Sequence, residues 1–121
     1  EKEKLNSVNE VRILASIKHP CVISYKEAFL DEPSSSLCIV MELSNGGDLY
    51  QRILKYQKEN VQFQEVEVWK IFLQVLFGLK ALHDLNIMHR DLKSANVFLN
   101  KDGTVKLGDM NVSKVANKQG L

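Results

Sequence analysis

The sequence predicts an α+β fold with strands in its first third and helices after them, and three observations support this. Leu37–Met41 is an unbroken apolar run, as in a buried strand. Glu65–Leu85 repeats apolar residues at helical spacing and gives the strongest helix signal in the chain. Between them, Ser44–Asp48 is rich in residues that interrupt regular structure. We take this segment as the boundary between the two parts.

The composition limits the class of protein. The 121 residues are enough for one small domain, and 45% hydrophobic with 26% charged residues is typical of a globular chain. A net charge of +1 gives no electrostatic reason to expect binding to nucleic acid or to an acidic membrane. The apolar run around Ile71–Leu79 is much shorter than the roughly 20 residues that span a membrane, so we expect no membrane insertion.

The cysteines and the first residues indicate the setting. Cys21 and Cys38 are too few for a disulfide scaffold, although one disulfide stays open. We expect a reducing, intracellular environment in which both are small apolar core residues rather than reactive thiols. Glu1–Lys4 is charged and has no apolar stretch, so it is not a secretory signal. Because the first residue is not Met, we expect that the chain begins inside something larger or was trimmed.

The N-terminal part is predicted to be a helix followed by an antiparallel pair of strands. Lys18–Pro20 ends the helix, because the residue before a proline avoids the helical region. Cys21–Tyr25 is predicted as the first strand, Asp31–Ser36 as a turn and Leu37–Met41 as the second strand. The helix itself is predicted from apolar residues spaced three and four apart, namely Leu5, Val8, Val11, Leu14 and Ile17.

Two helices are predicted after the boundary. Leu49–Gln57 is a short helix, and the polar segment Lys58–Gln64 is a loop. Glu65–Leu85 is the long helix, and its middle is apolar on nearly every side. We therefore expect it to be buried on more than one side.

A hairpin is predicted from Val97–Leu99 and Thr104–Leu107. The segment Asn100–Gly103 between them contains Asp-Gly, which is typical of a tight turn between strands.

This hairpin predicts which polar side chains meet. Asn96 should lie opposite Leu107 or Gly108, so Asn96 and Asp109 emerge at the same end, and a loop can bring Asp91 there. Two carboxylates and an amide are hard oxygen ligands of the kind that Mg²⁺ prefers. Together with one nearby lysine, they are suited to phosphoryl transfer.

Five segments, in this order along the chain, resemble protein kinases. Leu37–Leu43 and Gly46–Leu49 resemble the strand and hinge that bind adenine, and Leu79–His83 resembles the end of the helix before the catalytic loop. His89–Asn96 fits the H-R-D-L-x-x-x-N catalytic loop, and Leu107–Asn111 stands where kinases have D-F-G.

The resemblance implies a protein-kinase-like bilobal α+β fold, present in part. Residues 1–43 would form part of the small lobe, with its regulatory helix and antiparallel strands. Residues 44–121 would form part of the large lobe, from the hinge exit through the long helix, catalytic loop and metal-site hairpin to the start of the activation segment. Four strings are most similar to the NIMA-related (Nek) serine/threonine kinases, namely Ile17–Pro20, Ile39–Glu42, Gly46–Leu49 and Lys93–Leu99.

The function that this resemblance implies is transfer of the ATP γ-phosphate, with Mg²⁺, to Ser or Thr hydroxyls of a protein substrate. The fragment alone is expected to be inactive, as the excised middle of a kinase domain without the glycine-rich loop, the strand lysine or A-P-E. Nek resemblance also implies the cytoplasm, centrosome, cilium or axoneme, with microtubule or ciliary partners. The alternative is a pseudokinase or scaffold, whereas Lys93 argues against a small-molecule phosphotransferase.

The resemblance assigns roles by position around the catalytic loop. Asp91 resembles the base that accepts the substrate hydroxyl proton, and Lys93 resembles the lysine that contacts the transferred phosphate. Asn96, also a catalytic-loop residue, and Asp109 resemble the Mg²⁺ ligands. His89 is expected to be packed rather than to act as an acid or base.

The nucleotide would be held by residues between the two lobes. Met41 resembles the gatekeeper beside the pocket, and Glu42 and Ser44 would offer backbone groups to adenine. Asp48 lies where the family often contacts ribose, and Phe98 would pack beneath adenine.

Regulatory roles are implied for four further residues. Arg90 resembles the arginine that receives an activation-loop phosphate. Ser7–Glu10 has the spacing of a capping box, but we favour an ion pair of Glu10 with a strand lysine, because Leu5 extends the apolar stripe upstream. Met110-Asn111 replaces Phe-Gly; Asn tolerates positive φ and Met fills irregular gaps. We interpret this as a tuned switch rather than a lost one.

Overall fold

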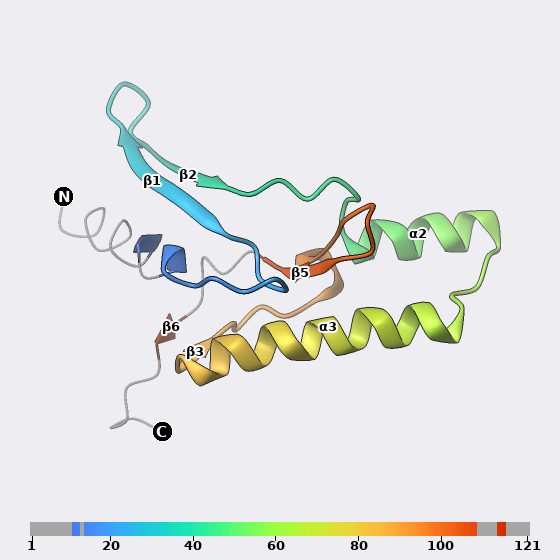
Figure 1. Ribbon diagram of the computed structural model, residues 1–121. Helices are drawn as coiled ribbons and strands as arrows, with labels where there is room; N and C mark the ends of the chain where they lie inside the picture. Colours follow the sequence, from blue (N-terminus) through green and yellow to red (C-terminus); the bar gives the residue numbers. More distant parts are fainter. Residues whose placement is uncertain (1–10, 13, 109–113, 116–121) are drawn as a thin grey trace.

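A computed structural model of the protein describes residues 11–12, 14–108 and 114–115. Strand β5 (Val105–Leu107) lies between the β1–β2 ribbon, formed by Tyr25–Asp31 and Ser36–Met41, and the long helix α3 (Glu65–Asp84) (Figure 1). No described helix is long and apolar enough to cross a bilayer. Three side chains are almost completely buried around β5, namely Val22, Leu82 and Leu107.

The N-terminal segment is helical at residues 11–12 and 14–15 and leaves the helix before Lys18–Pro20, as predicted. A strand at Cys21–Tyr25 is a wrong prediction, because β1 begins only at Tyr25. The Leu107 amide instead donates to the Cys21 carbonyl at 2.8 Å, and the Ile23 amide donates to the Leu107 carbonyl at 2.7 Å. The apolar and β-branched residues of this segment therefore form a short backbone pairing with Leu107 of the hairpin and do not form a regular strand.

An antiparallel pair is present, but its first strand is β1 and not the predicted Cys21–Tyr25. The second strand and the turn before it are confirmed, because β1 and β2 are joined through a turn at residues 32–35. The burial expected for the second strand is wrong. No residue of β2 is buried, and Val40 and Met41 are each 41% exposed. Within the described residues this sheet has only two strands. An apolar run predicts a strand that is packed on both faces, and that packing is missing in the described part of the chain.

Helix α2 (Leu49–Glu59) begins and ends with side-chain and backbone caps. The Asp48 carboxylate accepts a hydrogen bond from the Gln51 amide at 2.9 Å, which satisfies a free donor of the first turn. Asn60 ends the helix in the left-handed region, with φ 54°.

Helix α3 confirms the predicted long helix, but its expected burial on several sides is wrong. Only Gly78 and Leu82 are buried, because the helix packs mainly against β5 and the short strand β3 (Ile87–Met88) on one side. Four further apolar residues of the helix, Ile71, Val75, Leu79 and Ala81, are partly buried against the core. The apolar side chains that are exposed are Val66, Val68, Trp69, Phe72, Leu73, Leu76 and Phe77.

The hairpin of β4 (Val97–Leu99) and β5 is confirmed, with Val97 opposite Leu107 and Leu99 opposite Val105. Gly103 supplies the left-handed residue that the turn needs, with φ 90°. In a separate two-stranded sheet, β3 pairs with β6 (Lys114–Val115).

The outer edge of β5 is covered by a helix side chain and a loop. The Gln74 amide of α3 accepts from the Val105 N–H at 2.9 Å and donates to the Gly103 carbonyl at 3.2 Å. Both backbone groups of Leu107 are paired with the segment at Cys21–Ile23. The outer edge of β5 is therefore hydrogen-bonded from Gly103 to Leu107, first to α3 and then to the segment before β1.

Gly78→Ala should destabilise the fold, because an added Cβ would lie 2.5 Å from the Cys21 carbonyl oxygen and 3.2 Å from Leu107. The clash outweighs the helix preference of alanine, and we expect a net loss of about 1–2 kcal/mol in the free energy of unfolding of the intact protein. Urea unfolding measures it. Lys80→Ala, which removes only an exposed ion pair with Asp84, is the control and should have little effect. A Gly78→Ala variant as stable as the wild type would contradict this packing.

Candidate active site

The loop before β4 brings an acidic and an amide side chain together at the open end of the hairpin. The 3₁₀ turn η1 (Ser94–Asn96) leads directly into β4. The buried Asn96 donates from Nδ2 to the Asp91 carbonyl at 2.7 Å and to the Asp91 carboxylate at 3.2 Å. The Gly108 amide donates to the Asn96 carbonyl at 3.0 Å, which confirms the predicted position of Asn96 opposite Gly108.

A lysine lies beside the same carboxylate. Lys93 Nζ is 3.5 Å from Asp91 Oδ2, and the two side chains are 57% and 40% exposed. A pair this exposed contributes little to stability. Both groups therefore stay within reach of an approaching molecule.

His89 ties the loop to the end of β5, and its expected packing is confirmed by 3% exposure. The Asp91 amide donates to Nδ1 at 3.2 Å, which assigns the ring proton to Nε2, and Nε2 lies 2.8 Å from the Gly108 carbonyl. Arg90, between His89 and Asp91, is in the left-handed region with φ 69°. The loop thus makes a sharp turn that is held by His89 on one side and Asn96 on the other.

Four of the predicted site residues lie outside the described residues: Glu10, Asp109, Met110 and Asn111. In the part of the chain that is described, no three His, Cys, Asp or Glu side chains gather into a metal-binding group. The donor chemistry at Asn96 nevertheless fits a hard cation. Its Nδ2 donates to Asp91, so its Oδ1 is the amide atom that can coordinate a metal ion. Oxygen is the ligand atom that Mg²⁺ prefers.

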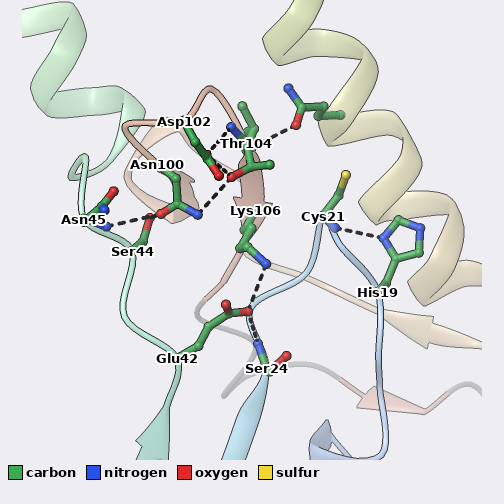
Figure 2. Close-up of polar contacts among 12 residues, drawn as sticks. His19, Cys21, Ser24, Glu42, Ser44, Asn45, Asn100, Asp102, Thr104 and Lys106 are labelled. Carbon is green, nitrogen blue, oxygen red and sulfur yellow. Dashed lines mark hydrogen bonds and ion pairs between the residues drawn. The ribbon is translucent and has the colours of Figure 1, made fainter.

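The predicted hinge residues follow β2 and contact the hairpin. Met41 ends the strand, and the Glu42 carboxylate accepts from the Ser24 amide at 2.8 Å and pairs with Lys106 at 3.2 Å (Figure 2). Two residues on, the Ser44 hydroxyl lies 2.9 Å from the Leu99 carbonyl.

Asp48 and Phe98 lie on paired backbone segments. An isolated antiparallel bridge joins them, and the Asp48 carboxylate also caps α2. A Cβ on Gly108 would lie 2.4 Å from the Phe98 ring, so the bare backbone of Gly108 is what admits the ring.

The Lys106 pairing with Glu42 is a contact that sequence reasoning missed. Alternation along the hairpin places Lys106 on the face opposite Val105 and Leu107, but no spacing rule names its partner. Burial pushes the pKa of Glu42 up, while the Ser24 N–H and Lys106 push it down more strongly, so the pKa lies below its usual value. The pair is largely covered, with 15% and 24% of the two side chains exposed.

Comparison with known proteins gives a consistent family. The protein kinase domain family matches residues 1–121. The chain is 46% identical to the serine/threonine-protein kinase Nek1 of Mus musculus over 117 residues, covering 97% of this chain and 9% of the relative. It is 41% identical to the probable serine/threonine-protein kinase nek2 of Dictyostelium discoideum over 121 residues, covering 98% of this chain and 29% of that relative.

The fold agrees with a solved kinase. The crystal structure of the yeast RNA Pol II CTD kinase CTDK-1 complex matches with a TM-score of 0.78 and 28% identity, over 94% of this chain and 36% of that chain. The α+β arrangement is therefore a partial kinase fold.

Lys106→Met should lower the free energy of unfolding of the protein by an amount that depends on pH. The folded pKa of Glu42 is lowered, so the stability that its charge contributes is complete above the unfolded pKa, about 4.3, and is lost as the pH falls through the folded value. We expect a loss of about 1–3 kcal/mol at pH 7, because the carboxylate loses a charged partner, and a smaller loss in acid. Urea unfolding of wild type and variant at pH 7 and in acid measures this.

Lys101→Met, at the exposed hairpin tip, is the control and should change stability little at either pH. An equal loss for Lys106→Met at both pH values would argue against an electrostatic contribution.

Proposed function

This chain belongs to the protein kinase family, and we propose that it is the central part of a serine/threonine kinase that transfers the ATP γ-phosphate to protein hydroxyls. The chain spans 9% and 29% of the two relatives described above, so the activity of the whole protein is inferred. The observation that carries the proposal is the Asn96 amide, which holds the Asp91 carboxylate at the end of the hairpin.

Asp91 is the proposed base. Asn96 and the His89 ring fix its backbone and one carboxylate oxygen, while the side chain stays 40% exposed, so that an acceptor hydroxyl could reach it. Lys93 is the proposed contact of the transferred phosphate, because its ammonium lies beside that carboxylate and is exposed. The chemistry needs positioning and charge stabilisation more than covalent steps from the protein.

The proposed metal ligands are Asn96 and Asp109. Mg²⁺, when bound, would neutralise charge on the phosphates. Asn96 fits this role through its Oδ1, and Gly108, the residue before Asp109, is hydrogen-bonded to Asn96.

The nucleotide site is proposed at the junction of the β1–β2 ribbon and the hairpin. Met41 would be the gatekeeper, the backbones of Glu42 and Ser44 would bind adenine, Asp48 would contact ribose and Phe98 would pack beneath the base. The contacts of Glu42 and Ser44 with the hairpin support this placement, because they join the two parts that would enclose the ligand.

Regulation and surroundings are proposed from family resemblance. Residues 1–43 would belong to the small lobe and 44–121 to the large lobe. Glu10 would pair with a strand lysine, and Arg90, whose turn exposes its side chain, would receive an activation-loop phosphate. Nek-like proteins suggest the cytoplasm, centrosome, cilium or axoneme, with microtubule or ciliary partners.

A pseudokinase or scaffold is the second candidate, and Met110-Asn111 in place of Phe-Gly is the observation that favours it. Asp109, the proposed metal ligand, and the catalytic-loop residues favour an active enzyme.

Asp91→Asn in the intact protein should lower kcat by about 10²–10⁴-fold, the usual contribution of a general base. The KM for ATP should change little, because Asp91 acts on the acceptor hydroxyl. Phosphate transfer from labelled ATP to a generic Ser/Thr peptide measures both, with chelation of Mg²⁺ as the control that abolishes wild-type turnover. A variant with wild-type turnover would exclude Asp91 as the base.

Restoring Phe-Gly at Met110-Asn111 separates the two candidates. If the site tunes a working switch, kcat/KM should change less than about tenfold, or about 1.4 kcal/mol of barrier. If the site holds an inactive state, activity should rise by orders of magnitude, because a competent state populated at about 1% weakens apparent affinity about a hundredfold. A wild type that stays silent at saturating Mg·ATP, even when phosphorylated, would support the scaffold.

A further inference from the structure

The segment after the hinge runs along the end of β4. The Gly46 amide donates to the Leu99 carbonyl, and the Leu99 amide donates to the Gly47 carbonyl, each at 2.8 Å. The approach is so close that a Cβ on Gly46 would lie 2.4 Å from the Leu99 oxygen. These backbone bonds fix residues 46 and 47 but do not reach the residues nearer the hinge.

The Asn100 side chain extends this attachment toward the hinge. Its Oδ1 accepts from the Asn45 amide at 3.2 Å and lies 2.8 Å from the Ser44 hydroxyl, which has one proton to share between this oxygen and the Leu99 carbonyl. In return, the Asn45 side chain accepts from the Lys101 amide at 2.8 Å. Figure 2 shows Asn100 between Ser44 and Asn45 on one side and Thr104 on the other.

The other end of the Asn100 amide is held by a directed chain of hydrogen bonds. The Thr104 hydroxyl is 2.5 Å from the Asp102 carboxylate, which can only accept, so Thr104 donates its proton there. Its oxygen then accepts from Asn100 Nδ2 at 3.1 Å. The Thr104 amide also donates to Asp102 at 2.9 Å. Asp102 and Thr104 therefore decide which way the amide faces, and its oxygen points at Ser44 and Asn45.

The segment between Glu42 and Gly46 has little packing to position it. Leu43 is 87% exposed, and Asn45 is also exposed. Glu42 is held at one end by Ser24 and Lys106. Because apolar burial contributes little here, the polar contacts set where the Ser44 backbone lies.

We propose that Asn100 is a positioning residue for nucleotide binding, which holds the backbone of Ser44 and Asn45 through an amide oriented by Thr104 and Asp102. The inference rests on the proposed function, in which the Ser44 backbone binds adenine. Asn100 touches no substrate in this role. It preorganises the hinge exit, so its loss lowers affinity for the nucleotide and leaves the phosphate-transfer step intact.

The test compares Asn100→Ala with wild type in the intact protein, by steady-state phosphorylation of a generic Ser/Thr peptide and by calorimetric titration with ADP. We expect the KM for ATP and the Kd for ADP to rise roughly five- to twentyfold, with kcat within about twofold, the pattern of lost ground-state binding. Asn100→Asp keeps an acceptor oxygen toward Ser44 and Asn45, so its KM should lie closer to wild type than to the alanine variant. Lys101→Ala, which leaves the Lys101 backbone amide in place, is the matched control and should match wild type.

Three outcomes would overturn the proposal: an unchanged KM for Asn100→Ala, an Asn100→Asp variant no better than alanine, or a fall in kcat without a rise in KM. If Asn100→Ala fails to fold, Thr104→Val serves instead, because it frees the amide to turn while keeping Asn100. It should raise the KM for ATP two- to fivefold, roughly the effect of one weakened hydrogen bond, and an unchanged KM would overturn the proposal. A wild type that neither binds ADP nor turns over would refute the proposed function instead.

Discussion

The pairing of β4 with β5 is the constraint on which the rest of the described structure depends. Opposing Val97 to Leu107 places Asn96 beside Gly108, so the loop with Asp91 meets the chain that leaves the hairpin. The same strands present Leu99 to the segment after the hinge and Leu107 to the loop before β1. A slip of one residue would turn Leu107 out of the core and move all of these contacts together.

The polar contacts around the hairpin explain how chemistry can be positioned on so small a framework. Backbone pairing sets the spacing, and a few oriented side chains then fix the direction of individual groups. His89 and Asn96 hold the loop from two sides, His89 by contacts to backbone atoms and Asn96 by contacts to both the backbone and the carboxylate of Asp91. Glu42 and Lys106 do the same between the ribbon and the hairpin, under partial cover that keeps water from competing.

Signals within one stretch of sequence predicted most of the helices and strands. They could not identify which residues far apart in the chain contact each other. The Asp-Gly turn and the long apolar repeat before Leu85 each carry their signal within one stretch of chain. The error at Cys21–Tyr25 arose because β-branched residues pair equally well with a neighbour or with a remote residue such as Leu107. The burial expected of α3 failed for the same reason, since an apolar surface does not say what covers it. Motif spacing led to Asp91 and Asn96, whereas Lys106 and Asn100 act through partners more than 50 positions away.

Gln74 shows how a helix side chain can cover the hydrogen-bonding edge of a strand. An unpaired edge offers alternating donors and acceptors to any extended segment of another molecule, and such edges are where proteins join into aggregates. The Gln74 amide presents one acceptor and one donor at the positions a neighbouring strand would use, at Val105 and Gly103. Together with the Cys21–Ile23 segment, which pairs with Leu107, this one polar residue of α3 occupies positions at which a strand of another molecule could otherwise add to the hairpin.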